Sequence, residues 1–476
     1  MQRPTSFKNP PSQIFRKNFS QKSLKEGFHQ KVKKKNTKGV DRVDPNTFGK
    51  NLSDSVKTIS KKCLKGTYKF SPYLELLKLK GRGKEPRVIC IPTVRDRLVL
   101  HQLKETLFEI FPECVRRKTS RNYIQEINTY IDSKEGTKMS IIYGDIKNFY
   151  DSIDRDILFK KIGWRIKSKV MLSLIKRAIE SPVVPKGYRR SDLKVYRAGK
   201  KGIPQGLAVS NILASIYLFD FDTIMRSQGG KYFRYIDDIL IICDAKERKD
   251  IQKKMKTEIE GSRFKLTLHD EEKTFSGDSS DGFKYLGYSF RPDGLVSVSE
   301  SSIERYIEGI ASKFTAYSKR KRYTIEKDKL LTKEERQSIL VRELNLKITG
   351  AISEDRRYGW VFYYSEINDL SVLHRIDKCI DRFFKRTKDF PNGSPSNLKK
   401  LSRAYYESKH SPGSGYIHDY KRYKTVQQKQ NYLLSKGQIE KKKEYTPKQI
   451  EMLFADCRYR EISELENDER NIYPLA

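Results

Sequence analysis

The sequence lacks the features of a membrane-spanning or disulfide-bonded protein. No stretch of its 476 residues approaches the roughly 18 uninterrupted apolar residues that cross a bilayer. The polar segment from Met1 to Phe15 lacks the apolar run of a signal peptide. The six cysteines are scattered, with no CxxC pair and no histidine at ligand spacing. We therefore predict reduced, buried cysteines and a cytoplasmic protein that has no membrane partner.

Negative charge is also scarce. The chain has 98 Lys and Arg against 60 Asp and Glu, which gives a formal net charge of +38. Self-repulsion of this size is expected where a polyanion supplies the compensating charge, so a nucleic acid is the predicted partner. A wholly disordered basic chain is excluded, because 37% of the residues are hydrophobic and 11% are aromatic.

The composition changes along the chain and indicates about three domains at roughly 150 residues each. Amphipathic helical patterns alternate with short β-rich runs as far as Phe290, which indicates an α/β or α+β domain. The first forty residues have little periodic apolar content and are predicted to form a flexible or partner-ordered arm. The predicted segments are a basic N-terminal extension (1–44), the mixed domain (45–298), a helical segment (299–390) and a basic, tyrosine-rich C-terminal region (391–476).

Individual elements are predicted from apolar runs and helical spacing. The predicted strands include 87–91, 140–143, 239–243 and 284–288, and the predicted helices of the later segment are 303–314, 340–352 and 372–384.

Three acidic side chains carry the predicted chemistry. Asp145 ends an apolar run, and Asp237-Asp238 directly precedes the strongly apolar run 239–243. Carboxylates embedded in buried β sequence carry a high desolvation cost unless a partner offsets it. A divalent metal is such a partner, and two Mg²⁺ ions can activate a hydroxyl and stabilise a leaving phosphate. Taken alone, either motif also fits an ordinary turn or strand end.

A tight loop lies between these acidic motifs, where Gly202, Pro204 and Gly206 precede an apolar helical pattern. Backbone N–H groups and the Gln205 amide can approach a nucleotide closely in such a loop. In order and spacing, the motifs resemble those of bacterial reverse transcriptases of the group II intron-like lineage. The matching motifs are Arg87–Arg97 (fingers), Asp145–Tyr150, Pro204–Gly206 with Ser210, Tyr235–Asp238 (three palm motifs) and Phe283–Gly287 (end of the palm).

This resemblance implies an α+β, right-hand polymerase fold. Fingers and a palm with an antiparallel sheet would be followed by an α-helical thumb and a C-terminal helical region. The implied activity is RNA-directed DNA polymerase, a nucleotidyltransferase with two Mg²⁺ ions per active site, which Mn²⁺ could replace. Asp145 and Asp237 would bridge the ions, Asp238 would be a more secondary ligand, and the Ile146 carbonyl would also hold metal.

The resemblance further implies a nucleotide site for dNTPs. Tyr150 matches the steric gate against a ribose 2′-hydroxyl, although a core aromatic beside Phe149 is the alternative. Gln205 matches the residue that contacts the incoming nucleotide and template. The backbone from Ile146 through Phe149 to Tyr150 would also hold the nucleotide. The fingers cations Lys80 and Arg87 would clamp the triphosphate, and Lys84 is a weaker candidate for the same role. Lys273 would bind or protonate the leaving pyrophosphate, although it also fits a surface lysine that faces acidic residues.

Departures from the family pattern narrow the subclass. Ser210-Asn211 stands where group II intron enzymes continue as Ser-Pro, no zinc-ligating endonuclease module follows the thumb, and the retron Val-Thr-Gly signature is absent. The remaining resemblance is to the unknown-group or defence-associated reverse transcriptases, helped by Arg357–Ser365, which looks like their α-helical C-terminal region. That class implies antiphage defence and cDNA synthesis on a structured noncoding RNA, which would serve as template and scaffold, with a DNA product. A homo-oligomer is also compatible with it.

Other functions remain open from sequence. They are a group II intron-type or retron-type reverse transcriptase, or a non-catalytic RNA-binding scaffold on the same fold. The basic helical stretch around Lys313 and Arg320–Arg322 would face a duplex, or would simply be solvated. We expect the tyrosines from Tyr416 to Tyr423, in a flexible basic tail, to stack on RNA bases. Protein priming is the alternative, for which the tail offers the hydroxyls of Tyr416, Tyr420, Tyr423, Tyr432 and Tyr473.

Overall fold

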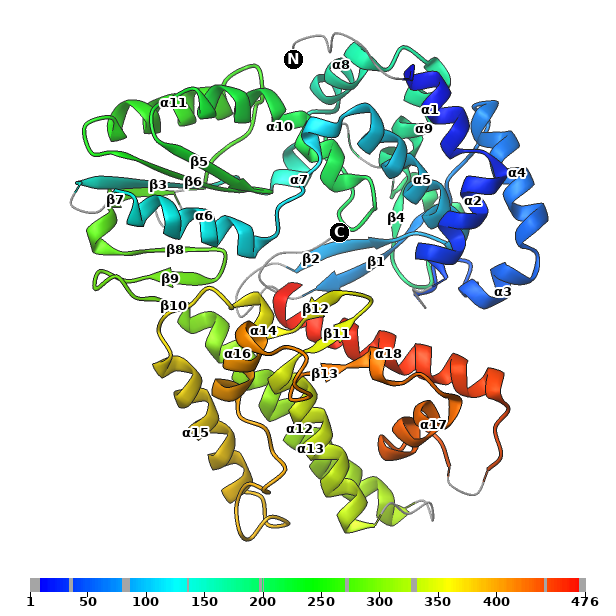
Figure 1. The fold of residues 1–476 in the computed structure, drawn as a ribbon. Helices are drawn as coiled ribbons and strands as arrows, with labels where there is room; N and C mark the ends of the chain where they lie inside the picture. The colour runs from blue at the N-terminus through cyan, green and yellow to red at the C-terminus, as the bar shows by residue number, and fades with distance from the viewer. Residues whose placement is uncertain are drawn as a thin grey trace. The chain divides into compact units, whose positions relative to one another are not determined.

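The computed structural model divides the chain into two compact units (Figure 1). The first contains the residues up to Arg117 together with Lys134–Ser279, and the second contains Lys118–Ser133 together with Ser280–Leu475. The four segments predicted from the sequence remain predictions. The structure describes residues 9–33, 37–78, 86–134, 137–196, 199, 201–269, 274–326, 332–440 and 443–470.

Both helices and strands build the first unit, which confirms the predicted mixed α+β content. Its elements are α1 (Pro11–Asn18), α2 (Gln21–Gly27), η1 (Phe28–Val32), α3 (Pro45–Lys50), α4 (Leu52–Leu64), β1 (Tyr73–Lys78), β2 (Arg87–Ile91), α5 (Val94–Ile110), η2 (Pro112–Cys114), β3 (Met139–Asp145), α7 (Phe149–Ser152), α8 (Arg155–Arg165), α9 (Lys169–Glu180), β4 (Val183–Val184), η3 (Arg190–Lys194), α10 (Ser210–Arg226), β5 (Lys231–Tyr235), β6 (Asp238–Asp244), α11 (Arg248–Glu260) and β7 (Phe275–Asp278).

An antiparallel sheet of order β5-β6-β3-β7 forms the centre of this unit. Residues Ile239 to Cys243 of β6 are all buried, as their continuous apolar run predicts. Helix α11 lies along one face of the sheet (Figure 1). The register pairs Asp145 with Asp238 and Tyr235 with Asp238, so three neighbouring strands converge where the acidic motifs lie.

A smaller sheet of order β2-β1-β4 lies in the same unit. Strand β2 coincides with the predicted strand 87–91 and pairs antiparallel with β1. Thr93 caps α5, and the buried Asp96 carboxylate accepts hydrogen bonds from the Tyr68 hydroxyl (2.6 Å) and the Thr93 hydroxyl (2.8 Å). These bonds satisfy a buried charge and fix the segment that follows β2.

The prediction of a flexible N-terminal arm is wrong for the residues that the structure describes. Helices α1 and α2 pack against α5 and α4. Their apolar side chains recur every four or five residues, which is the spacing that buries one face of a helix. The Lys-rich and Gln-rich composition between them obscured this periodicity. The buried set is Ile14, Phe15, Phe19, Leu24, Phe28 and Val32.

The second unit is mainly helical, and α12 and α13 pack side by side within it (Figure 1). Its elements are α6 (Ser120–Asp132), β8 (Phe283–Tyr285), β9 (Tyr288–Phe290), β10 (Val296–Val298), α12 (Glu300–Glu326), α13 (Lys333–Thr349), β11 (Ala351–Ser353), β12 (Arg356–Tyr358), α14 (Trp360–Tyr363), α15 (Ser371–Lys385), α16 (Leu401–His410), β13 (His418–Asp419), η5 (Tyr420–Arg422), α17 (Val426–Ser435) and α18 (Pro447–Arg470), preceded by η4 (Ser279–Asp281) at the junction of the units.

Three predicted elements of this unit differ in the structure. The predicted strand 284–288 is a hairpin, because Leu286 and Gly287 turn the chain with positive φ angles of 50° and 80°. The predicted helix 340–352 ends at Thr349, where Gly350 adopts a φ of 63° and strand β11 begins. Part of the segment expected to be helical, Arg356–Tyr358, is strand β12.

The C-terminal tyrosines are not all part of a flexible tail. Tyr420 and Tyr432 are 4% and 7% exposed, and both hydroxyls donate hydrogen bonds of 2.6 Å to the same Glu461 oxygen. Their rings belong to a hydrophobic core with Phe454. Tyr420 therefore has no free ring face for an RNA base, and neither hydroxyl is an accessible primer. Tyr473 lies outside the described residues.

The six cysteines are free, and all but the half-buried Cys379 are buried, as predicted. Among the described residues, no helix is both long and apolar enough to cross a membrane.

Replacing Phe19 tests whether the N-terminal helices are part of the folded core. Phe19 is fully buried, and Phe19→Ala is expected to lower the free energy of unfolding by about 3–5 kcal/mol in equilibrium urea denaturation. Lys22→Ala, at an exposed position of α2, is the control and should change stability little. Equal stability of Phe19→Ala and the wild type would contradict the packed arrangement.

Candidate active site

A two-residue turn presents the central acidic motif. Ile236 and Asp237 connect β5 to β6, since Tyr235 and Asp238 are paired across the hairpin. Ile236 has a φ of 65°, which a β-branched side chain rarely adopts and which costs roughly 1–3 kcal/mol. Strain of this kind persists where surrounding contacts hold the backbone, so the turn needs an anchor.

Arg234 and Asp222 provide that anchor, and the sequence analysis missed both. The Arg234 guanidinium meets the Asp222 carboxylate through two bonds of 2.5 Å, and its Nη1 donates to the Ile236 carbonyl at 2.7 Å. Tyr232 also donates to Asp222 at 2.8 Å. Paired, charge-assisted bonds of this geometry are strong and directional. They tie the turn to α10, an arrangement that the separation of these residues in sequence did not reveal.

Asp237 and Asp145 interact across the end of the sheet. Burial and, second to it, the negative charge of Asp145 together raise the pKa of Asp237 from 3.8 to about 6. Arg87 and Arg234 oppose this shift. The backbone brings the strands together here, because Ile146 N–H donates to the Asp237 carbonyl at 3.4 Å. The two half-buried carboxylates are therefore close enough for the charge of one to raise the pKa of the other.

Asp238 has a different environment from Asp237. It is 6% exposed, and its Oδ1 accepts a 2.5 Å hydrogen bond from the Tyr143 hydroxyl. Tyr143 lies two residues before Asp145 on β3, so it reaches Asp238 diagonally across the strand pair. Sequence reasoning placed no role on Tyr143, although an aromatic two residues before an acidic strand end was a visible signal.

The donor chemistry fits a divalent metal. Two crowded carboxylates offer hard oxygen ligands, and a bound cation would relieve both their repulsion and their desolvation. Among the described residues, no group of three or more His, Cys, Asp or Glu is gathered closely enough to hold a metal. Mg²⁺ commonly uses only one or two carboxylates and completes its shell with water and substrate phosphates, so Asp145 and Asp237 suit it. His269 Nε2 lies 3.8 Å from Asp145 Oδ2.

The predicted steric-gate residue, Tyr150, is buried beside this site. Its ring is 7% exposed, and its hydroxyl donates to Asn211 Oδ1 on α10. Burial raises the pKa of the phenol, and the negative charge of Asp237 acts in the same direction, so the hydroxyl stays protonated. Phe149 is 2% exposed, so its side chain is not available to a nucleotide. Asn211, noted in the sequence only as a departure from Ser-Pro, is thus the partner of Tyr150.

The Gly-Pro loop lies directly on strand β2. Gly206 has a φ of 93°, and a Cβ there would stand 2.8 Å from a methyl group of Ile89. The carbonyl of Gln205 accepts a 2.8 Å bond from Cys90 N–H, and its side-chain Nε2 lies 3.4 Å from Asp151 Oδ2. Only glycine permits this approach, which brings the loop beside the strand that carries Arg87.

The structure brings most of the predicted site residues together within the first unit. Arg87 is half-buried at the start of β2, and its charge lowers the pKa of Asp237. Lys80, Lys84 and Lys273 lie outside the described residues. Asp154 stands directly before Arg155-Asp156-Ile157, a pattern that predicts a helix N-cap, and its carboxylate does accept bonds from Asp156 N–H (3.0 Å) and Ile157 N–H (3.2 Å).

Paired carboxylates at the end of an antiparallel sheet, beside a tight glycine loop, are the arrangement of a nucleotidyl-transferring enzyme. Residues 79–290 match the family model described as reverse transcriptase (RNA-dependent DNA polymerase). Residues 79–290 therefore form a reverse transcriptase domain, and the match supports RNA-directed DNA polymerase activity.

Two curated relatives are similar over this region. Protein YkfC of Escherichia coli (strain K12) is 25% identical over 296 residues, which cover 53% of this chain and 75% of YkfC. The group II intron-encoded protein LtrA of Lactococcus lactis subsp. cremoris is 27% identical over 186 residues, covering 38% of this chain and only 30% of LtrA. Among solved structures, telomerase from Candida albicans in complex with a fragment of telomeric RNA has a TM-score of 0.40 at 13% identity, covering 73% of this chain and 67% of that chain. That likeness is too weak to support a conclusion.

The raised pKa of Asp237 predicts a pH-dependent cost to stability. Because the folded-state pKa of about 6 lies above the ordinary 3.8, the folded protein loses stability as pH rises from about 4 to above 6. In EDTA at pH 7, Asp237→Asn is therefore expected to be more stable than the wild type by about 1–3 kcal/mol, with no gain near pH 3.

Urea denaturation across this pH range measures the effect. Asp244→Asn, at the exposed end of β6, is the matched control and should show no such pH dependence. A gain for Asp237→Asn that is the same at every pH would contradict the assigned cause.

Proposed function

We propose that the protein synthesises cDNA from a bound, structured noncoding RNA by two-metal-ion nucleotidyl transfer, and that it acts in bacterial antiphage defence. The polymerase part rests on one feature above the others, the half-buried Asp145 and Asp237 at the end of the sheet, where the charge of Asp145 raises the pKa of Asp237 and that of Arg87 lowers it. A binding scaffold has no need for a buried pair of carboxylates that costs stability. If the protein were only an RNA-binding scaffold, neutral residues in place of Asp145 and Asp237 would be tolerated.

In the proposed reaction, Asp145 and Asp237 hold two Mg²⁺ ions, with Asp238 in a secondary role and the Ile146 carbonyl as a further ligand. The bound ions supply Lewis acidity that lowers the pKa of the primer hydroxyl and neutralises charge on the transferred phosphate. Arg87, with Lys80, clamps the triphosphate, and Lys273 is proposed to bind the leaving pyrophosphate. Arg234 does not touch the reactants, and instead holds the turn that presents Asp237.

Tyr150 is proposed to select deoxynucleotides. Its ring would occupy the space of a ribose 2′-hydroxyl, and its bond to Asn211 supports this role because it removes the freedom of the ring to swing away. Gln205 is proposed to contact the incoming nucleotide and the template strand. Its carbonyl is fixed by Cys90 N–H, so the side chain starts from a defined backbone.

The noncoding RNA partner is proposed from charge. The net charge of +38 exceeds what one primer-template and one triphosphate would need, which favours a stably bound RNA whose affinity falls steeply with salt. The defence role rests on the resemblance of the sequence to the defence-associated class. A homo-oligomer is compatible with this proposal.

A group II intron-type enzyme is the second candidate. The similarity to the intron-encoded protein LtrA favours it, although that similarity covers only 30% of LtrA. Ser210-Asn211 in place of Ser-Pro argues for the first candidate. Inspection of the neighbouring DNA for intron ribozyme structure separates the two.

Neutralising the acidic turn tests the polymerase. Asp237→Asn combined with Asp238→Asn is expected to abolish Mg²⁺-dependent dNTP incorporation by the purified protein, because the variant loses two oxygen-ligand charges. Asp244→Asn should retain incorporation. Wild-type incorporation by the double variant would refute the proposed site.

The same two variants test the proposed role in defence, and sequencing of the bound nucleic acid tests the proposed RNA template. Phage protection should disappear with the double variant and persist with Asp244→Asn. Sequencing the nucleic acid that copurifies with the wild type should recover one dominant structured RNA with matching cDNA. Full protection by the double variant would favour the scaffold over the polymerase in defence.

Removing the Tyr150 ring tests nucleotide selection. Tyr150→Ala is expected to admit ribonucleotides, with the dNTP-to-rNTP preference in kcat/KM reduced at least about tenfold, the equivalent of roughly 1.4 kcal/mol. Tyr150→Phe keeps the ring but loses the bond to Asn211, and should retain most of the preference. An unchanged preference in Tyr150→Ala would identify Tyr150 as a core aromatic only.

A further inference from the structure

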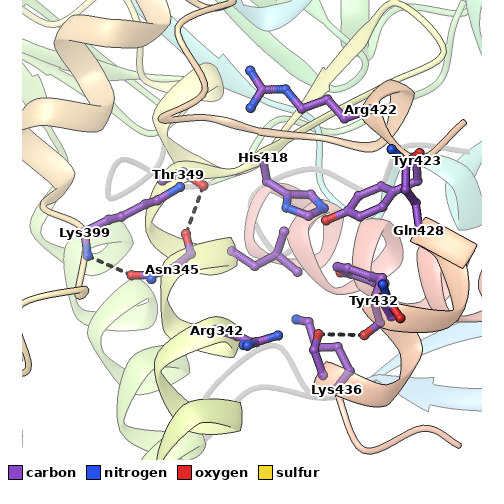
Figure 2. Close-up of a pocket in the computed structure, with 13 residues that line it drawn as sticks. Arg342, Asn345, Thr349, Lys399, His418, Arg422, Tyr423, Gln428, Tyr432 and Lys436 are labelled. Carbon is purple, nitrogen blue, oxygen red and sulfur yellow. Dashed lines mark hydrogen bonds between the residues drawn. The ribbon is translucent and has the colours of Figure 1, made fainter.

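The second unit contains a pocket of about 730 Å³ that belongs to neither the acidic site nor the first unit (Figure 2). Helix α13 forms one wall, with Arg342 and Asn345, and α17 forms the other. His418 of β13 lies between Asn345 and Tyr423 (Figure 2). The volume falls in the range of roughly 300–1,000 Å³ typical of small-ligand sites.

The lining of the pocket is basic. Arg342, Lys399, Arg422 and Lys436 contribute to it, and none of its lining residues is acidic. The charge of Lys436 is compensated by Glu461, whose Oε1 lies 2.7 Å from Lys436 Nζ. The other three cations pair with no carboxylate among the described residues. Arg422 donates to the Gly413 carbonyl at 3.2 Å, and Lys399 donates to the Tyr416 carbonyl.

The charges of these cations overlap in the pocket, since Arg422 acts on Lys399, and Arg342 and Arg422 both act on Tyr423. Burial lowers the pKa of Lys399, and the charge of Arg422 lowers it further. Burial raises the pKa of Tyr423 to about 12, against the opposing charges of Arg342 and Arg422. Like charges brought together in this way are stabilised by a bound anion, and guanidinium groups match phosphate geometry.

His418 adds an unused hydrogen-bonding atom. Its Nε2 is buried and has no partner, and burial lowers the pKa of the imidazole to about 4, so the ring is neutral at pH 7. A buried polar atom without a partner is costly, and a ligand can recover that cost by bonding to it. The neighbouring Tyr432 is held in place by the hydrogen bond of 2.6 Å that its hydroxyl donates to Glu461.

The pocket offers recognition for more than a simple anion. The rings of His418, Tyr423 and Tyr432 lie within 4.7–5.9 Å of one another, and they form an aromatic wall. Asn431, Gln428 and Ser435 line the α17 side with polar groups. Aromatic faces suit bases, amides suit base edges, and clustered cations suit phosphate, so one nucleotide unit uses all three features.

We infer that this pocket is a second nucleotide-binding site, separate from the polymerase centre, in which Arg342, Lys399 and Arg422 bind a phosphate while a base lies against His418 and Tyr423, which Tyr432 supports from the core. The occupant is either a free nucleotide or a single unstacked nucleotide of a bound RNA, because both present the same phosphate and base. The inference does not depend on polymerase activity.

Binding to the full-length protein in EDTA tests the site, because removing Mg²⁺ weakens metal-dependent triphosphate binding at the polymerase centre. The free probes are AMP, CMP, GMP, UMP and inorganic phosphate, measured by calorimetry. The RNA probe is a single-stranded oligonucleotide containing 4-thiouridine, photo-crosslinked and mapped by mass spectrometry.

The pocket variant is Arg342→Ala combined with Arg422→Ala, since both side chains are exposed and their loss should leave the fold intact. The matched control is Arg382→Ala combined with Arg386→Ala, which removes two charges from exposed positions of the same unit. We expect at least one nucleoside monophosphate, or the RNA crosslink at His418 or Tyr423, to weaken about tenfold or more in the pocket variant but not in the control.

The two arms identify the source of the nucleotide. Saturable binding of a monophosphate assigns a free nucleotide, and a crosslink without such binding assigns a nucleotide of RNA. His418→Phe keeps an aromatic ring and removes both nitrogens, and it should weaken the nucleotide more than inorganic phosphate. The inference is overturned if the pocket variant and the control bind every probe equally, or if inorganic phosphate binds as tightly as every nucleotide.

Discussion

The repulsion between the Asp145 and Asp237 carboxylates is the constraint around which the first unit is organised. Burying two like charges at the end of a sheet is unfavourable, and the elevated pKa of Asp237 expresses that cost. The surrounding structure keeps the pair together nonetheless. The Arg234–Asp222 pair holds the strained turn from α10, and the β3–β6 register places Asp145 opposite Asp238, the residue that follows Asp237. Unfavourable repulsion that the fold maintains in this way is characteristic of a functional site, because a bound ligand can relieve it.

Helix α10 and the loop that precedes it bring distant segments of the chain to this site. Gly206 lets the loop before α10 contact β2 directly, and Asn211 at the start of α10 holds Tyr150. Helix α10 therefore serves three parts of the site, since Asp222 farther along it anchors the acidic turn. A change in α10 would move the turn, the tyrosine and the loop together, so its apolar packing matters for chemistry as well as stability.

The positive charge of the chain is organised in more than one way. Arg87 and Arg234 act on the acidic site, whereas Arg342, Lys399 and Arg422 gather around a pocket in the second unit. Exposed surface lysines gain little from pairing and remain available to a polyanion. Buried or clustered cations have a specific requirement for an anion. The net charge alone does not distinguish these roles, because it counts each cation equally.

The sequence by itself determined the strands that carry Asp145 and Asp237, the helix cap at Asp154, the reduced state of the cysteines and the reverse transcriptase motifs. These features depend on short apolar runs, local hydrogen bonds and motif spacing, all of which involve residues that are close to one another in the sequence. The N-terminal helices were in principle visible too, but their sparse apolar spacing was hidden by basic residues. Only the tertiary structure decided that Asp222 anchors Arg234, that Asn211 holds Tyr150, that Tyr420 and Tyr432 are core residues, and that cations from α13 and the C-terminal region share a pocket. These contacts join residues from 12 to 94 positions apart, and a sequence without an alignment carries no signal for which distant side chains burial will bring together.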